Sequence, residues 1–180
     1  MKLTILQRRK YLRRILLALL VLFIAMAQNV PWLPVIYGAR ALPLLPLIVA
    51  IAIYDQPVPA VLYGAFAGAI WDVSALGGYH AIYLTLTAFG CAMSMRYFLN
   101  RNIFTIALLS FATTTLYLLV RWFVDFATLP ALSPAQLTLP LLREALPTLG
   151  YTMLMVPICF TLVNITVRRT SRRQREVRAD

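Results

Sequence analysis

Residues 15–39 read ILLALLVLFIAMAQNVPWLPVIYGA, a run of 25 residues without a charged side chain. Each helical residue rises about 1.5 Å, so about 20 apolar residues cross the roughly 30 Å of hydrocarbon in a bilayer. The run is long enough for a membrane-spanning helix, which we expect over 15–35. Further uncharged stretches predict spans in the same way over 79–95, 103–120 and 145–167.

The composition of the whole chain agrees with a surface that faces lipid. Hydrophobic residues make up 61% of the 180 residues and charged residues 13%, whereas a soluble domain carries roughly 25% charged residues. So few charges cannot coat a surface exposed to water. We predict an all-α, polytopic membrane protein of about six spans. Its helical domain covers 15–167, between a basic N-terminus (1–14) and an Arg-rich tail (168–180).

Two shorter uncharged runs leave part of the topology open. Residues 41–54 and 57–71 are each short for a span. They are compatible with two short helices that thin the bilayer, or with one re-entrant hairpin that packs against protein. Both arrangements keep the two termini on the same side of the membrane.

The stretch 126–142 is uncharged but contains Pro130, Pro134 and Pro140. Prolines at that density interrupt a spanning helix. We therefore expect an outer loop here that includes a short interfacial helix after Ser133.

Basic residues set the expected orientation. The net charge is +11, from 17 basic and 6 acidic residues, and the basic residues crowd both ends of the chain. With both ends in the cytoplasm, the six basic residues of each terminus, Arg96 and Arg101 lie inside, and Arg40 and Arg143 lie outside. This distribution follows the positive-inside rule. It favours a topology signal and contact with anionic lipid headgroups over nucleic-acid binding.

The first apolar run has a second interpretation. A basic start, an apolar stretch and the small residues Ala25 and Ala27 are also typical of a cleaved signal peptide. The apolar character continues through Val35 and Ile36, so we favour an uncleaved first helix.

Small residues recur at every fourth position before an acid, at Ala60, Gly64 and Gly68, followed by Asp72. Positions four apart lie on nearly the same helix face, and a glycine stripe lets another helix backbone approach closely. The stripe predicts either packing within the bundle or contact with a partner subunit.

A turn follows this stripe, with Asp72, Gly77, Gly78 and His80 as its marked residues. The glycines permit positive backbone φ angles, and the Asp72 carboxylate is suited to accept hydrogen bonds from backbone amides of the turn. We expect a capped turn, with a ligand or proton-relay pocket as the alternative.

The remaining polar residues do not predict a catalytic centre. His80 is the sole histidine, and Cys91 and Cys159 have no partner at metal-ligand spacing, so they are expected to pack as small hydrophobic residues. Arg121 and Asp125, four apart, predict an ion pair. Arg40 and Arg121 are candidates for contact with an anionic group or a partner. We predict no enzyme, no cofactor and no metal, and the sequence does not indicate an oligomeric state.

Residues 64–88 read GAFAGAIWDVSALGGYHAIYLTLTA and resemble the core pattern of the MreD family of rod shape-determining membrane proteins. The segment RYFLNR at 96–101 and the overall size are similar as well. The resemblance implies a place in the bacterial inner membrane and in the cell-elongation machinery. It also implies an MreC-type partner and links to MreB and to peptidoglycan synthases.

The same resemblance implies a fold similar to the S-components of energy-coupling-factor transporters. The alternative function is therefore the substrate-binding membrane subunit of a vitamin-type transporter. That function predicts a polar cavity that opens outward, lined by Asp72, His80, Arg40 and Thr85.

Overall fold

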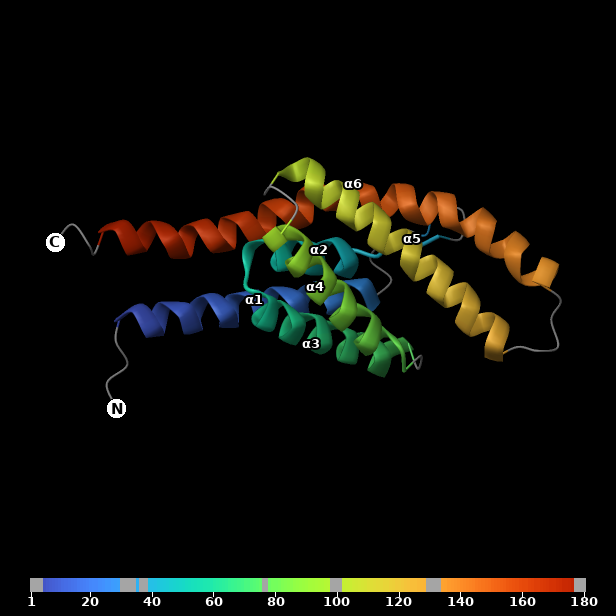
Figure 1. Cartoon of the computed structure of the whole chain (residues 1–180), viewed down its shortest axis with the longest axis horizontal. Coiled ribbons are helices and arrows are strands. Elements are labelled where there is room, and N and C mark those ends of the chain that lie inside the picture. The colour runs from blue at the N-terminus through green and yellow to red at the C-terminus, as the bar shows by residue number, and fades with distance from the viewer. Residues whose placement is uncertain are drawn as a thin grey trace.

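The structure is a computed structural model and describes residues 5–29, 35, 39–75, 78–97, 102–128 and 134–176. In these ranges the regular elements are helices, as the sequence predicts (Figure 1). They are α1 (Ile5–Asn29), α2 (Leu44–Tyr54), α3 (Pro57–Ala75), α4 (His80–Tyr97), α5 (Ile103–Thr128) and α6 (Pro134–Glu176).

Successive helices run back and forth along the long axis of the molecule (Figure 1). The start of α1 and the end of α6 consequently lie together, at the left of the view. We call this the terminal end. The opposite end, where α3 leads into α4 and α5 leads toward α6, is the distal end.

Four helical segments are long and apolar enough to cross a membrane: Tyr11–Asn29, Pro57–Ala75, Ile103–Thr128 and Leu142–Arg168. The described helices therefore form a helical membrane protein but do not show six spans. The predicted span over 79–95 corresponds to α4, whose polar residues, among them His80 and Arg96, make it less apolar. The run over 57–71 is longer than predicted, because α3 continues past the charged Asp72.

The predicted short span over 41–54 is instead the central helix of the bundle. Its helical part, α2, has only 11 residues, and all of Leu44–Ile53 is buried. It contacts each of the other five helices. An apolar run of this length suits a core helix as well as lipid, and here protein surrounds it.

The buried start of α2 has hydrogen-bond partners for its free amides. The amide of Leu44 donates to Oε1 of Gln28 at 3.2 Å, and the amide of Leu42, two residues earlier, donates to Oγ1 of Thr152 at 3.2 Å. The first amides of a helix have no partner within the helix itself. These side chains of α1 and α6 therefore help to make burial of the α2 start possible.

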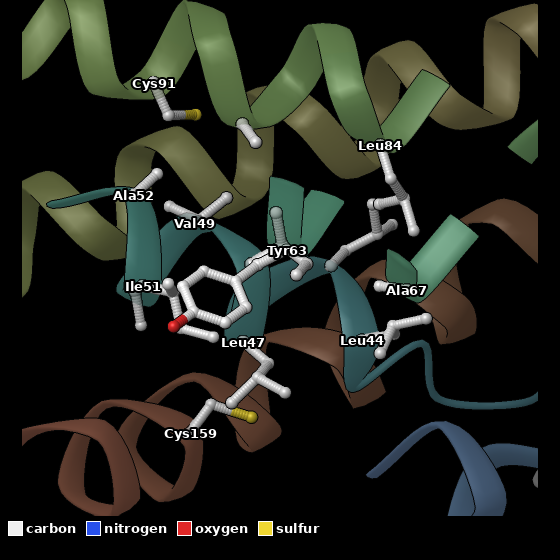
Figure 2. Close-up of a cluster of buried hydrophobic side chains, with 14 of the residues drawn as sticks. Leu44, Leu47, Val49, Ile51, Ala52, Tyr63, Ala67, Leu84, Cys91 and Cys159 are labelled. Atoms are coloured by element: carbon white, nitrogen blue, oxygen red, sulfur yellow. The ribbon is translucent and has the colours of Figure 1, made fainter. Parts of the chain in front are cut away.

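The two cysteines pack against α2 from opposite sides. Figure 2 shows Cys91 of α4 and Cys159 of α6 with α2 between them. Both thiols are free and buried. They fill the core as small apolar groups, in line with the prediction from the sequence.

The expected outer loop over 126–142 is shorter than predicted. The helix α5 extends to Thr128, and α6 begins at Pro134, where the sequence predicts a short helix, but it continues through Pro140 as one long helix. The first part of the predicted Arg-rich tail is helical too, since α6 continues to Glu176. Proline interrupts membrane helices less than soluble ones, because neighbouring groups and local adjustments satisfy the freed carbonyls.

Candidate functional site

The glycine stripe of α3 lies directly against α4. A Cβ atom built on Gly64 would lie 2.5 Å from the carbonyl oxygen of Leu84, and one on Gly68 would lie 2.3 Å from Cα of Ala81. Real Cβ atoms do not approach other atoms so closely. Ala60, the third member of the stripe, is buried as well. The stripe therefore allows contact between two backbones inside the bundle, which is the internal-packing alternative.

Asp72 joins the end of α3 to the start of α4. Its Oδ1 accepts hydrogen bonds from the backbone amide of His80 at 2.9 Å and from Nδ1 of the His80 ring at 2.8 Å. Its Oδ2 accepts from the amide of Ala81 at 2.8 Å. A carboxylate at a helix N-terminus satisfies free amides and interacts favourably with the helix dipole. We call Asp72, His80 and Ala81 the Asp72 joint.

The turn between the two helices supports this joint. Gly78 has φ +70°, a left-handed conformation that glycine adopts at no steric cost. Gly77, the other glycine named in the sequence analysis, lies outside the described residues. The turn thus brings His80 back onto Asp72 within eight residues.

The His80 ring links the joint to α5. His80 is 4% exposed, and its Nε2 lies 3.2 Å from the hydroxyl of Tyr117, within hydrogen-bond distance. Because a carboxylate only accepts, Nδ1 carries a proton toward Asp72. Asp72, His80 and Tyr117 therefore form one hydrogen-bonded chain across three helices.

Aromatic rings enclose this chain. The His80 ring stacks between Trp71, at a centroid distance of 4.4 Å, and Tyr79, at 4.2 Å. Trp71 also stacks on Tyr117 at 5.3 Å, and the Tyr83 hydroxyl donates to the carbonyl oxygen of Thr113. The rings restrict access of water to the imidazole.

This arrangement holds structure more readily than it binds a ligand. Both oxygens of Asp72 and both nitrogens of His80 are engaged by protein groups. Thr85, a predicted cavity residue, donates from its hydroxyl to the carbonyl oxygen of Ala81 in its own helix. Arg40 is exposed ahead of α2. Asp72, His80 and Thr85 are therefore engaged by protein groups instead of lining a polar cavity.

Arg121 forms a second polar cluster at the distal end. Its guanidinium lies 3.8 Å from the carboxylate of Asp125, as the spacing predicts, and also 3.8 Å from that of Glu144 on α6. All three side chains are about 40% exposed. The cluster bridges α5 and α6 but remains accessible. In the part of the chain that the structure describes, no three acidic, histidine or cysteine side chains gather as a metal site would require.

Sequence reasoning missed an ion pair at the terminal end. Arg13 lies 3.4 Å from the Asp55 carboxylate and donates to the carbonyl oxygen of Tyr54 at 3.1 Å. The Tyr63 hydroxyl donates to the carbonyl oxygen of Arg14 at 3.2 Å. These contacts tie α1 to the α2–α3 turn. Asp55 is an acid between two apolar runs, and the N-terminus of the chain is basic. These opposite charges are the sequence feature that could have predicted the ion pair.

Among the described residues, two of the cavities are large enough for a small molecule. One of about 590 Å³ lies at the terminal end, where the α2–α3 turn meets the end of α4, and its lining includes Asp55, Gln56 and Arg96. The other, of about 370 Å³, is an apolar groove between α5 and α6. Neither is lined by Asp72 or His80.

Comparison of the chain with protein-family models, with curated proteins and with solved structures finds no match.

Proposed function

We propose that this protein is a non-enzymatic membrane scaffold of the bacterial cell-elongation machinery, with an MreC-type protein as its partner. The observation that carries the proposal is the Asp72 joint. Its carboxylate and imidazole form hydrogen bonds within the protein, and the glycine stripe before it lets the backbones of α3 and α4 come into contact. These are the features of a rigid platform. The resemblance of residues 64–88 to the MreD family indicates that the assembly is the cell-elongation machinery.

In this proposal the protein lies in the inner membrane with both termini in the cytoplasm. The back-and-forth course of the helices supports it, because it brings the start of α1 and the end of α6 to one end (Figure 1). The basic residues of the sequence crowd that same end, which the positive-inside rule assigns to the cytoplasm. The helices α2 and α4 then complete a six-helix topology with α2 enclosed by protein.

The alternative of a transporter subunit requires a polar cavity that opens at the distal end. Asp72, His80 and Thr85 satisfy one another or their own helix instead. Of the two cavities described above, the one with charged lining residues lies where the α2–α3 turn meets the end of α4, toward the terminal end. These placements favour the scaffold.

Co-purification tests the proposal directly. The tagged protein is extracted from bacterial membranes in mild detergent, and the proteins that accompany it are identified by mass spectrometry. We expect an MreC-type membrane protein together with elongation components such as MreB and peptidoglycan synthases. Recovery of an ATPase with its coupling subunit, or tight binding of a vitamin, would instead establish the transporter function.

A matched pair of variants tests the role of the platform. Gly68→Ala places a methyl group against the backbone of α4, whereas Gly150→Ala on α6 places the same group in open space. We expect loss of the partner from Gly68→Ala and normal recovery with Gly150→Ala, at equal amounts of protein in the membrane. Equal recovery from both variants would show that the α3–α4 contact does not matter for assembly.

A further inference from the structure

A groove between α5 and α6 lies apart from the Asp72 joint. Its lining includes Leu118, Leu119 and Trp122 of α5, together with Leu142, Ala145 and Leu149 of α6. Its volume is about 370 Å³. We call it the α5–α6 groove. It lies in the distal half of the molecule, where α6 runs back alongside α5 (Figure 1).

The groove opens from two helices that are both apolar enough to cross a membrane. Hydrocarbon chains, not water, surround such helices, and an empty apolar space loses dispersion contacts on one side. The α5 part of the lining, residues 115–122, rises over about 10 Å at 1.5 Å per residue. This length accommodates part of one acyl chain, not a complete lipid.

Trp122, which lines the groove, has a hydrogen-bond donor that lacks an acceptor. Its indole Nε1 is buried and has no hydrogen-bond partner among the described residues. A buried donor without an acceptor is costly, so such groups are nearly always paired. In the structure protein covers this nitrogen, so the indole has to rotate toward the groove before the ester carbonyl of a lipid supplies the missing acceptor.

The charges beside the groove select the headgroup. Arg121 and Glu144 are sequence neighbours of Trp122 and Ala145, and Asp125 lies one turn beyond Arg121. Their mutual contacts of 3.8 Å are longer than hydrogen bonds, so the exposed carboxylates can accept further donors. The cluster therefore presents one cation and two carboxylates. A ligand that carries both an anionic and a cationic group fits such a cluster better than an anion alone.

We infer that the α5–α6 groove binds a zwitterionic aminophospholipid. Its acyl chain fills the groove, an ester carbonyl accepts from the Trp122 indole, and its phosphate lies near Arg121. Its primary ammonium group donates to Asp125 and Glu144. A trimethylated ammonium group has no proton to donate, so phosphatidylcholine lacks this last contact. The inference goes beyond the scaffold function and does not depend on the identity of any protein partner.

Lipid titration of the purified full chain tests the inference. Phosphatidylethanolamine, phosphatidylcholine and phosphatidylglycerol with identical acyl chains are added to the protein in detergent, and binding is followed by native mass spectrometry. We expect phosphatidylethanolamine to bind about tenfold more tightly than either of the others, which corresponds to one charge-assisted hydrogen bond. Equal binding of the three lipids would overturn the headgroup assignment.

Two neighbouring substitutions on α6 test the groove. Ala145→Trp fills the groove, whereas Leu146→Trp changes the next residue, which is 75% exposed and does not line it. We expect Ala145→Trp to lose the tight lipid and Leu146→Trp to keep it. In addition, Glu144→Gln should remove the preference for phosphatidylethanolamine over phosphatidylcholine while leaving binding of the acyl chain. Retention of the tight lipid by a folded Ala145→Trp variant would contradict the proposed location.

Fluorescence gives a result even if Ala145→Trp does not fold. In mixed vesicles only one lipid class carries brominated acyl chains, which quench nearby tryptophans. The quenching due to Trp122 is the difference between the natural chain and Trp122→Phe. We expect this part to be quenched more by brominated phosphatidylethanolamine than by the other brominated lipids at the same mole fraction. Equal quenching by all three lipids would refute the site.

Discussion

The hairpin of α3 and α4 and the hairpin of α5 and α6 are held together in different ways. In the first, Gly64 and Gly68 leave no room for a side chain, and the Asp72 carboxylate closes the turn. In the second, large side chains meet around the α5–α6 groove, and Arg121 bridges the helices through long, accessible contacts. The first hairpin is packed backbone against backbone, and the second leaves space.

This difference indicates where each hairpin tolerates change. Lipid chains are as apolar as leucine, so helices in a membrane associate through close packing and hydrogen bonds, not through a hydrophobic driving force. The α3–α4 hairpin has both close packing and hydrogen bonds between its helices. The α5–α6 hairpin has fewer such contacts, so contacts with lipid make up a larger part of its packing. Substitutions should therefore cost most in the first hairpin.

The largest effect is expected from Gly68→Ala. The new Cβ would lie 2.3 Å from Cα of Ala81 and 2.6 Å from the carbonyl oxygen of His80, and a backbone cannot move aside as a flexible side chain can. We expect a loss of about 3 kcal/mol in the free energy of unfolding, measured by denaturation in mixed micelles. The shift of α4 should also disturb the Asp72 joint.

Two other glycines serve as controls for this substitution. A Cβ on Gly90 of α4 or Gly150 of α6 meets nothing within 4 Å. Alanine is preferred over glycine inside a helix, so Gly90→Ala and Gly150→Ala should be neutral or stabilising by up to about 1 kcal/mol. If Gly68→Ala behaved like these two variants, the backbone contact between α3 and α4 would not exist as described.

The next effect is expected from Asp72→Asn. The amide group keeps one acceptor oxygen but turns its NH₂ toward either the His80 or the Ala81 amide, where two donors then face each other. The charge that favours the α4 N-terminus is also lost. We expect a loss of about 2 kcal/mol by the same denaturation measurement. Asp125→Asn, at an exposed position of α5, should change stability much less.

A smaller effect is expected from Tyr117→Phe, which tests the connection between the two hairpins. The helices α4 and α5 are consecutive but make only limited contact, and the His80–Tyr117 hydrogen bond is one of their few polar links. Loss of the hydroxyl leaves Nε2 of His80 without this hydrogen-bond partner. We expect a loss of about 1 kcal/mol, since hydrogen bonds between membrane helices are individually weak.

The control for this variant is Tyr11→Phe, because Tyr11 is 53% exposed on α1. It should leave the free energy of unfolding unchanged. If Tyr117→Phe also left the free energy of unfolding unchanged, the aromatic stack alone would hold His80. The hydrogen-bonded chain would then contribute nothing to stability.

The sequence predicts the first hairpin better than the second, for a physical reason. The spacing of Gly64 and Gly68, and an acid placed eight residues before His80, are local patterns that imply close packing and a capped turn. The Tyr117 hydroxyl is 37 residues from His80 along the chain. Its position depends on how α5 crosses the bundle, and the spacing of residues within a segment does not predict how helices cross.

The errors in the fold have a related cause. Counting uncharged residues finds the run at 41–54 but cannot distinguish a helix that faces lipid from one enclosed by protein, because both are apolar throughout. Likewise, the sequence predicts that Asp72 and Pro140 interrupt apolar helices, yet α3 and α6 continue past them. In each case groups elsewhere in the molecule determine whether a charge or a proline ends a helix.

The smallest effect is expected from Arg121→Gln. Both carboxylates lie 3.8 Å away, and all three side chains are about 40% exposed, so solvent and headgroups screen the attraction. Exposed ion pairs contribute little to stability, so we expect a change of less than about 0.5 kcal/mol in the free energy of unfolding. Lipid binding should respond more, because the phosphate loses a cation. If the variant lost stability as strongly as Asp72→Asn, Arg121 would hold α5 to α6 as Asp72 holds α3 to α4, and the contrast between the two hairpins would be wrong.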